Sequence, residues 1–194
     1  AEGLVDLYEA GADESYLHAA AQLADHLMTD FLDEEQGGFF TTAKQHEALI
    51  LRHREGTDSA TPSANAVAAS ALARLSFHFD RDDWRRAATA AIRAYGRQMT
   101  RYPRAFAKSL AVVDFLTEGP VELALIGNAV QGSLSSLQQA VAQCYLPNRI
   151  IAISSPSTPS SLPLLKDRAT VSGMPSLYIC RNYTCRQPIP DPRL

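Results

Sequence analysis

The feature that most constrains the fold is an alanine-rich stretch, residues 62–79, that carries almost no charge. Arg74 is its one charged side chain before Asp80, and its apolar residues point in every direction around a helix. A helix that is apolar nearly all round is covered by its neighbours on most of its surface. We therefore predict a largely buried helix over residues 62–79, opened by Thr61-Pro62-Ser63.

Charge-poor helices alternate along the chain with charged, amphipathic ones. The charge-poor stretches are residues 3–10, 62–79 and 103–116, and the amphipathic ones are residues 13–31 and 82–101. An inner ring of buried helices inside an outer ring would produce this alternation. Antiparallel helical hairpins build such rings. The pattern predicts a mainly α domain over residues 1–118, a partial α/α toroid.

The character of the sequence changes after Gly119. Residues 121–127 read as a strand, 133–145 as a helix and 149–153 as a second strand, which is the order of a βαβ unit. Residues 176–180 are a third strand candidate. We expect a small α/β segment over residues 119–194, with Cys144 in its core on an apolar helix face.

Charge and composition argue against several classes of partner. The net charge is −3, so there is no basic footprint for a nucleic acid. No apolar run approaches the roughly 20 residues that span a membrane, and no secretory signal is visible. Three cysteines fit a reduced protein, and we expect a cytoplasmic one. The abrupt, helix-like start without an initiator methionine is typical of a fragment of a longer chain.

Cys180 and Cys185 are separated by four residues. They could form a local disulfide if the chain turns between them, or they could stay as thiols. Two cysteines cannot fill a tetrahedral zinc site, and no histidine follows them. The histidines of the chain do not have the spacing of metal ligands, so we predict no metal site. We also predict no cofactor.

A dense polar cluster leads into the buried helix and is the candidate site. Helix N-termini present unpaired N–H groups that hold polar ligands. The preceding connection, residues 33–61, exceeds the roughly 12–15 residues above which ordered loops are usually functional. We expect Arg52, Asp58, Ser63 and Asn65 to converge in one pocket. The candidate catalytic residues are Asp58, Arg54 and His53, and the candidate ligand-binding residues are Arg52, Ser63 and Asn65.

Each of these residues also has a structural explanation. Ser63 or Thr61 could be only a helix cap, and Asp58 could pair with an arginine or the helix dipole. His53 could be a surface residue. A buried Asn65 amide would need partners, from the loop or from a ligand.

Several motifs resemble one known family. Gly37-Gly38-Phe39-Phe40, Leu51-Arg52 and residues 58–68 resemble the C-terminal half of the thioredoxin-domain-containing, spermatogenesis-associated protein family. Residues 144–148 and 178–185 match its later segments, so the resemblance covers essentially the whole chain. Ser59 and Ala64 stand where the family often has glycine, whereas Asp58, Pro62, Ser63 and Asn65 are kept.

The resemblance implies an N-terminal thioredoxin-like domain followed by a six-hairpin toroid similar to N-acylglucosamine 2-epimerase. The first function that it implies is a sugar-directed domain, epimerase-like or hydrolase-like, with a small polar or sugar ligand. A glycosidase would need two carboxylates, and only Asp58 presents itself. The alternative is a noncatalytic module that binds clients or partners for the thioredoxin-like domain.

A partial toroid would leave apolar faces uncovered, so we also expect self-association. The residues expected on those faces are Leu4, Leu7, Tyr8, Phe106, Leu110 and Val113.

Overall fold

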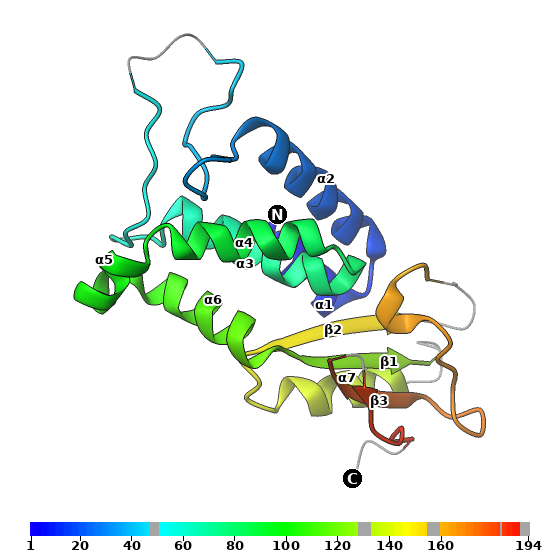
Figure 1. Cartoon of the computed structure of the whole chain (residues 1–194). Helices are drawn as coiled ribbons and strands as arrows, with labels where there is room; N and C mark the ends of the chain where they lie inside the picture. Colours follow the sequence, from blue (N-terminus) through cyan, green and yellow to red (C-terminus); the bar gives the residue numbers. More distant parts are fainter. Residues whose placement is uncertain (47–50, 128–132, 155–159, 183, 191–194) are drawn as a thin grey trace. The chain divides into compact units, whose positions relative to one another are not determined.

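A computed structural model describes residues 1–46, 51–127, 133–154, 160–182 and 184–190 (Figure 1). About half of the chain is helical, and the strands form one small mixed sheet. Two compact units are present. Unit 1 holds residues 1–8 and 13–118, and unit 2 holds residues 9–12 and 119–194.

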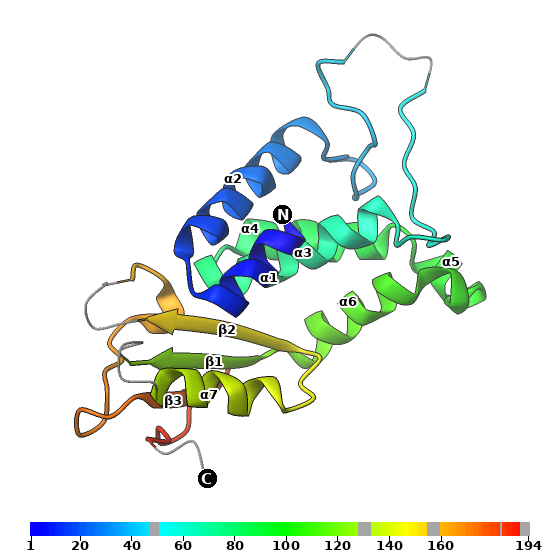
Figure 2. The same cartoon turned by 180° about the vertical axis from the view of Figure 1, so that it is seen from behind.

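Unit 1 is built from helices. In chain order they are α1 (Glu2–Gly11, whose residues 9–11 belong to unit 2), α2 (Glu14–Asp30), α3 (Ala64–Phe79), α4 (Asp82–Arg93), α5 (Gly96–Arg101), the 3-10 turn η1 (Pro103–Phe106) and α6 (Ala107–Glu118). Helix α3 packs against α4, α6 and α2, and Figures 1 and 2 show α3 and α4 running side by side. A long excursion of the chain connects α2 to α3 (Figure 1).

The charge-poor helix is buried, as predicted. More than half of the residues of α3 are buried, including Leu72 and Leu75, which are fully inaccessible to solvent. The helix starts two residues later than expected because Ser63 is its N-cap, and its hydroxyl accepts a hydrogen bond from the amide of Ala66. It ends at Phe79, and the left-handed backbone of the C-cap Asp80 stops the helix.

Two helices differ from their predicted extents. The helix expected over residues 82–101 breaks into α4 and α5, because the chain leaves helical geometry at Tyr95, immediately before Gly96. The helix expected from Pro103 begins as the 3-10 turn η1 before α6.

The apolar faces that were expected to be exposed are exposed only in part. Tyr8 and Phe106 are buried, so the prediction was wrong for them. The Tyr8 ring meets the His78 ring edge to face, with the ring centres 5.5 Å apart. Leu7 and Leu110 are 51% and 39% exposed.

Unit 2 is a four-stranded sheet with a helix. Its elements are β1 (Val121–Ile126), α7 (Ser133–Ala142), β2 (Arg149–Ser154), the 3-10 turn η3 (Pro163–Leu165), β3 (Ser176–Arg181) and β4 (Thr184–Cys185), in the sheet order β2-β1-β3-β4. β1 and β2 pair in parallel, which confirms the βαβ order, and β3 runs antiparallel to β1. One core consists of Leu123, Leu125, Leu137, Val141, Ile151, Ile153 and Leu177.

The placement of Cys144 in this core was wrong. Helix α7 ends at Ala142, three residues sooner than predicted, so Cys144 leaves the apolar helix face and is exposed. In the part of the chain that the structure describes, no helix is long and apolar enough to cross a bilayer.

Candidate functional site

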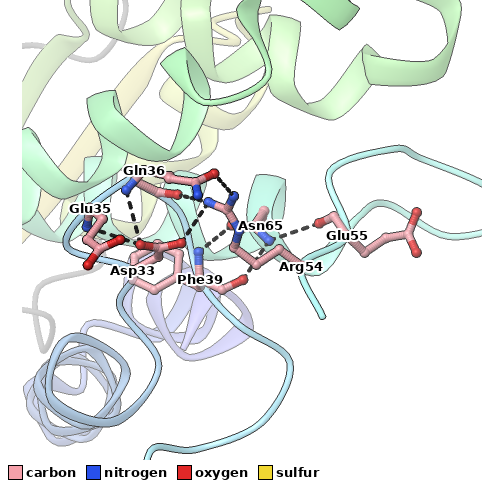
Figure 3. A network of polar contacts seen from close by, with 8 residues as sticks. Asp33, Glu35, Gln36, Phe39, Arg54, Glu55 and Asn65 are labelled. Atoms are coloured by element: carbon pink, nitrogen blue, oxygen red, sulfur yellow. Dashed lines mark hydrogen bonds and ion pairs between the residues drawn. The ribbon is translucent and has the colours of Figure 1, made fainter. Parts of the chain in front are cut away.

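Asn65 lies at the start of α3 and is the hub of the predicted cluster (Figure 3). Its side-chain oxygen accepts from the Phe39 amide at 2.7 Å. Its side-chain nitrogen donates to the carbonyls of Phe39 and Glu55, both at 2.9 Å. The residue is 3% exposed. The partners that a buried amide needs therefore come from the loop.

Glycine makes this close approach possible. A Cβ atom on Gly38 would lie 2.8 Å from the Asn65 side-chain oxygen, and φ at Gly38 is +84°. At Gly37, a Cβ atom would lie 2.8 Å from the carbonyl oxygen of Ala90 in α4. Both positions combine a left-handed backbone with contact too close for a side chain.

The cluster also contains an ion pair at the start of the loop. Arg54 Nη1 lies 3.0 Å from Asp33 Oδ2, and the Asp33 side chain is 8% exposed. The same guanidinium donates to the Gly37 carbonyl and the Gln36 side chain. The other Asp33 oxygen accepts from the amides of Glu35 and Gln36 (Figure 3). We call Asp33, Arg54 and Asn65 the polar clasp.

Asp33 was missed in the sequence because its partner lies 21 positions away. A local signal was present, since an Asp before a turn commonly accepts from the next amides. Tyr95 was also missed as a neighbour of the clasp. Burial raises the pKa of its phenol, and the positive charge of Arg54 opposes that shift.

Arg52 binds beside the clasp without joining it. Its Nη2 donates to the carbonyls of Thr42 and Asp30, at 2.6 and 3.3 Å. Its guanidinium stacks 4.0 Å from the centre of the Phe40 ring. This arginine thus fixes the base of the excursion to the end of α2.

Asp58 and Ser63 form a separate junction. One Asp58 oxygen accepts from the Ser63 amide at 2.8 Å, and the other accepts from the Lys108 amide at 2.9 Å. The carboxylate therefore ties the start of α3 to the start of α6. Ser63 acts as a cap, which was one of the two readings left open.

His53 lies on the solvent side of the excursion. Its Nε2 is 3.4 Å from Glu55 Oε2, and both side chains are more than half exposed. Hydrogen bonds from Thr57 and then from His53 lower the pKa of Glu55. Among the described residues, the His53 side chain contacts Glu55 and makes no hydrogen bond or ion pair with Asp58 or Asn65.

Two hollows flank residues 32–36. The smaller, of about 590 Å³, is lined by Phe40, Lys44, Leu51, Arg52 and Arg54. The larger, of about 950 Å³, is lined by residues from the end of α2, the following loop and α4. Of the four residues expected in one pocket, Arg52 alone lines the smaller hollow, whereas Asp58, Ser63 and Asn65 bond to the backbone. Neither of these two hollows is lined by all four residues, so their convergence in one pocket stays a prediction.

The cysteine pair of unit 2 is a second candidate site. Cys180 and Cys185 face each other across β3 and β4 and are joined by a disulfide. This decides between the two states that the sequence left open. Within the described ranges, no group of three or more His, Cys, Asp or Glu side chains could hold a metal ion.

Comparison with known proteins finds relatives over nearly the whole chain, although no family model matches. The chain is 30% identical to human spermatogenesis-associated protein 20 over an alignment of 196 residues, which covers 98% of the chain. The mouse protein is 31% identical, and an uncharacterized Caenorhabditis elegans protein is 24% identical. The chain spans about a quarter of the length of these relatives. It is therefore homologous to a C-terminal part of spermatogenesis-associated protein 20.

Proposed function

We propose that this chain is a noncatalytic binding module that serves a thioredoxin-like domain of the same protein. One observation carries the proposal: Asp58, Ser63 and Asn65 are bonded to main-chain groups of their own unit. A catalytic acid or base has to exchange a proton with its substrate. Both oxygens of Asp58 already accept from amides, so its chemistry is better suited to holding the fold.

The larger hollow is the binding surface that we favour. Its walls carry charges of both signs, with Glu34 and Glu35 on the loop and Arg86 and Arg93 on α4. A mixed-charge wall suits a polypeptide with complementary charges, because such pairs set orientation and the rate of encounter.

Titration calorimetry tests this role. The chain would be titrated with a thioredoxin-like domain of the same protein, supplied as a separate polypeptide. Replacing Arg86 and Arg93 by Glu should weaken binding by about tenfold or more. Arg97→Glu, on an exposed residue outside the hollow, is the control and should change the affinity by less than about twofold. Absence of binding by the unchanged chain would overturn the proposal.

The second candidate is a sugar-directed, epimerase-like or hydrolase-like domain. The smaller hollow favours it, because Arg52 and Arg54 line it together with the carboxyl-bearing Glu34 and Glu35. Against it, Lys44 holds Glu34 at 3.2 Å, and the Arg52 guanidinium covers the Phe40 ring on which a sugar would stack.

Proton NMR of the chain with a panel of N-acylhexosamines and glycosides distinguishes the two candidates. Product formation that is lost in Glu34→Gln or Asp58→Asn, with unchanged thermal melting, would favour the enzyme. A lack of turnover together with binding in the calorimeter would favour the module.

We further propose that unit 1 is part of a six-hairpin α/α toroid and that the protein is cytoplasmic. The burial of α3 among α2, α4 and α6 supports an inner-ring position. The exposed Leu7 and Leu110 support self-association of the chain. Light scattering at micromolar concentration tests it, with Leu7→Lys and Leu110→Lys expected to give monomers.

A further inference from the structure

The disulfide hairpin, which we define as β3 and β4 with the Cys180–Cys185 bond, differs from a buried structural cross-link in how its two sulfurs are placed. Cys180 is 1% exposed, whereas Cys185 is exposed on the short edge strand β4. A thiol arriving from solvent therefore reaches Cys185 and not Cys180.

A guanidinium lies against both sulfurs. Arg168 Nη2 is 2.9 Å from Cys185 Sγ and 3.5 Å from Cys180 Sγ. The other end of the guanidinium donates to the Leu164 carbonyl, and the group also lies over the Tyr178 ring. Arg168 is thus held in place from several sides and directed at the bond.

A buried carboxyl group accompanies this arginine. Glu122 is 2% exposed and is the partner of Cys180 in the register between β1 and β3, so the two side chains lie on one face of the sheet. Burial lowers the pKa of Arg168, and the fields of Glu122, Tyr178 and Asp167 oppose that shift. These groups therefore favour the charged guanidinium beside the sulfurs.

We propose that Cys180–Cys185 is a redox-active disulfide that takes two electrons from a dithiol, with Arg168 as the catalytic residue that stabilises the thiolates. A thiolate of the dithiol attacks Cys185 Sγ, the S–S bond breaks, and Cys180 leaves as a thiolate. The second thiol of the dithiol, after losing its proton to water, attacks the mixed disulfide and releases the Cys185 thiolate. The dithiol ends as a cyclic or internal disulfide, and the two protein sulfurs are reduced and take protons from water as the pH dictates.

The arginine favours this reaction because its contact strengthens as charge develops. A neutral disulfide sulfur is a weak acceptor, whereas a thiolate forms a charge-assisted hydrogen bond with a guanidinium. Interactions that are stronger in the transition state than in the ground state accelerate the step. A leaving thiol of lower pKa also leaves faster.

The rate of reduction by dithiothreitol tests the role of Arg168. The measurement uses the chain with Cys144→Ser, because Cys144 is the free, exposed thiol. Arg168→Gln should slow reduction about tenfold, and Arg168→Lys should restore part of the rate. Arg186→Gln, exposed and next to Cys185, removes the same charge and should change the rate by less than about twofold.

Two further readouts separate reactivity from folding. Ultraviolet titration of the reduced chain should show a thiol pKa below the ordinary cysteine range, and Arg168→Gln should raise it. With Cys180→Ser, Cys185 should form a mixed disulfide with glutathione, whereas with Cys185→Ser the buried Cys180 should react at least about tenfold more slowly. Thermal melting of the oxidised variants serves as the folding control.

Three outcomes would overturn the proposal. They are a disulfide that yields to dithiothreitol only after denaturation, equal reduction rates for Arg168→Gln and Arg186→Gln, and faster trapping at Cys180 than at Cys185. The site lies wholly in unit 2. Its failure would therefore be distinguishable from a failure of partner binding at α4.

Discussion

Each unit contains an arginine beside a buried carboxyl residue, and the two arginines serve different ends. In the polar clasp, Arg54 pairs with Asp33 and donates to the main chain of the loop. Beside the disulfide hairpin, Arg168 lies near Glu122 and donates to two sulfurs. The difference lies in what each arginine contacts besides the carboxyl group. A main-chain carbonyl can only be held in place, whereas a disulfide sulfur can react. Residue types alone therefore do not identify a site.

The largest expected effect comes from removing the Asn65 side chain from the polar clasp. Asn65→Ala removes three hydrogen bonds and leaves the buried amide and carbonyl of Phe39 without that partner. Each unsatisfied buried group costs about 1–3 kcal/mol, so the free energy of unfolding should fall by about 3 kcal/mol. Urea denaturation measures it, with exposed Gln98→Ala as a control that should be near neutral. A loss below about 1 kcal/mol would mean that water replaces the clasp.

Glycine substitutions test how tightly the loop is seated. A Cβ atom on Gly56 would lie 2.3 Å from the Tyr95 ring, so Gly56→Ala should destabilise unit 1 by about 2 kcal/mol. A Cβ atom on Gly96, which lies in α5, would have no neighbouring atom within 4 Å. Gly96→Ala should therefore be neutral or slightly stabilising in the same denaturation experiment. Equal losses for both variants would contradict the close packing of Gly56.

Exchanging the same substitution between the two arginines tests the comparison directly. Arg54→Gln should lower the free energy of unfolding by about 1.5 kcal/mol, because Asp33 loses its charge-assisted hydrogen bond but keeps those from the Glu35 and Gln36 amides. It should leave the reduction rate of the disulfide unchanged. Arg168→Gln should give the reverse order, with the larger effect on the rate. Stopped-flow kinetics of disulfide reduction and urea denaturation of both variants measure these effects. A slower reduction in Arg54→Gln would contradict the separation of the two roles.

A third pair, at the surface, gives the smallest effect. The hydrogen bond from Arg81 lowers the pKa of Asp83 from its ordinary value of 3.8. Because the folded-state pKa is depressed, the stabilisation is present above that ordinary value and is lost as the pH falls through the folded pKa. Both side chains are about 40% exposed, so Asp83→Asn should cost only about 0.5 kcal/mol at neutral pH. Thermal melting at neutral pH and in acid below the folded-state pKa of Asp83 should show the difference between wild type and variant disappearing in acid.

The periodicity of the sequence predicted the helices well and the side-chain contacts poorly. Helices α2 and α3 were predictable because their apolar spacing and caps, Asp13 and Ser63, are local signals. The pairing of Arg54 with Asp33 was not, because it depends on how a long loop folds back. Strand β4 has two residues and leaves no period to detect. The need of Asn65 for buried partners could be read from the sequence, but which partners it has could not.

Because Asn65 holds both ends of the excursion, the length of the chain between those ends can vary. One side chain binds Phe39 before the excursion and Glu55 after it, so the intervening chain starts and ends at a fixed point. Lengthening a loop between fixed ends is thermodynamically mild, at about 0.6 kcal/mol for each doubling. Insertions between Lys44 and Leu51, which leave Arg52 and Arg54 in place, should therefore be tolerated, and a peptide tag or reporter domain could be placed there without unfolding the helices.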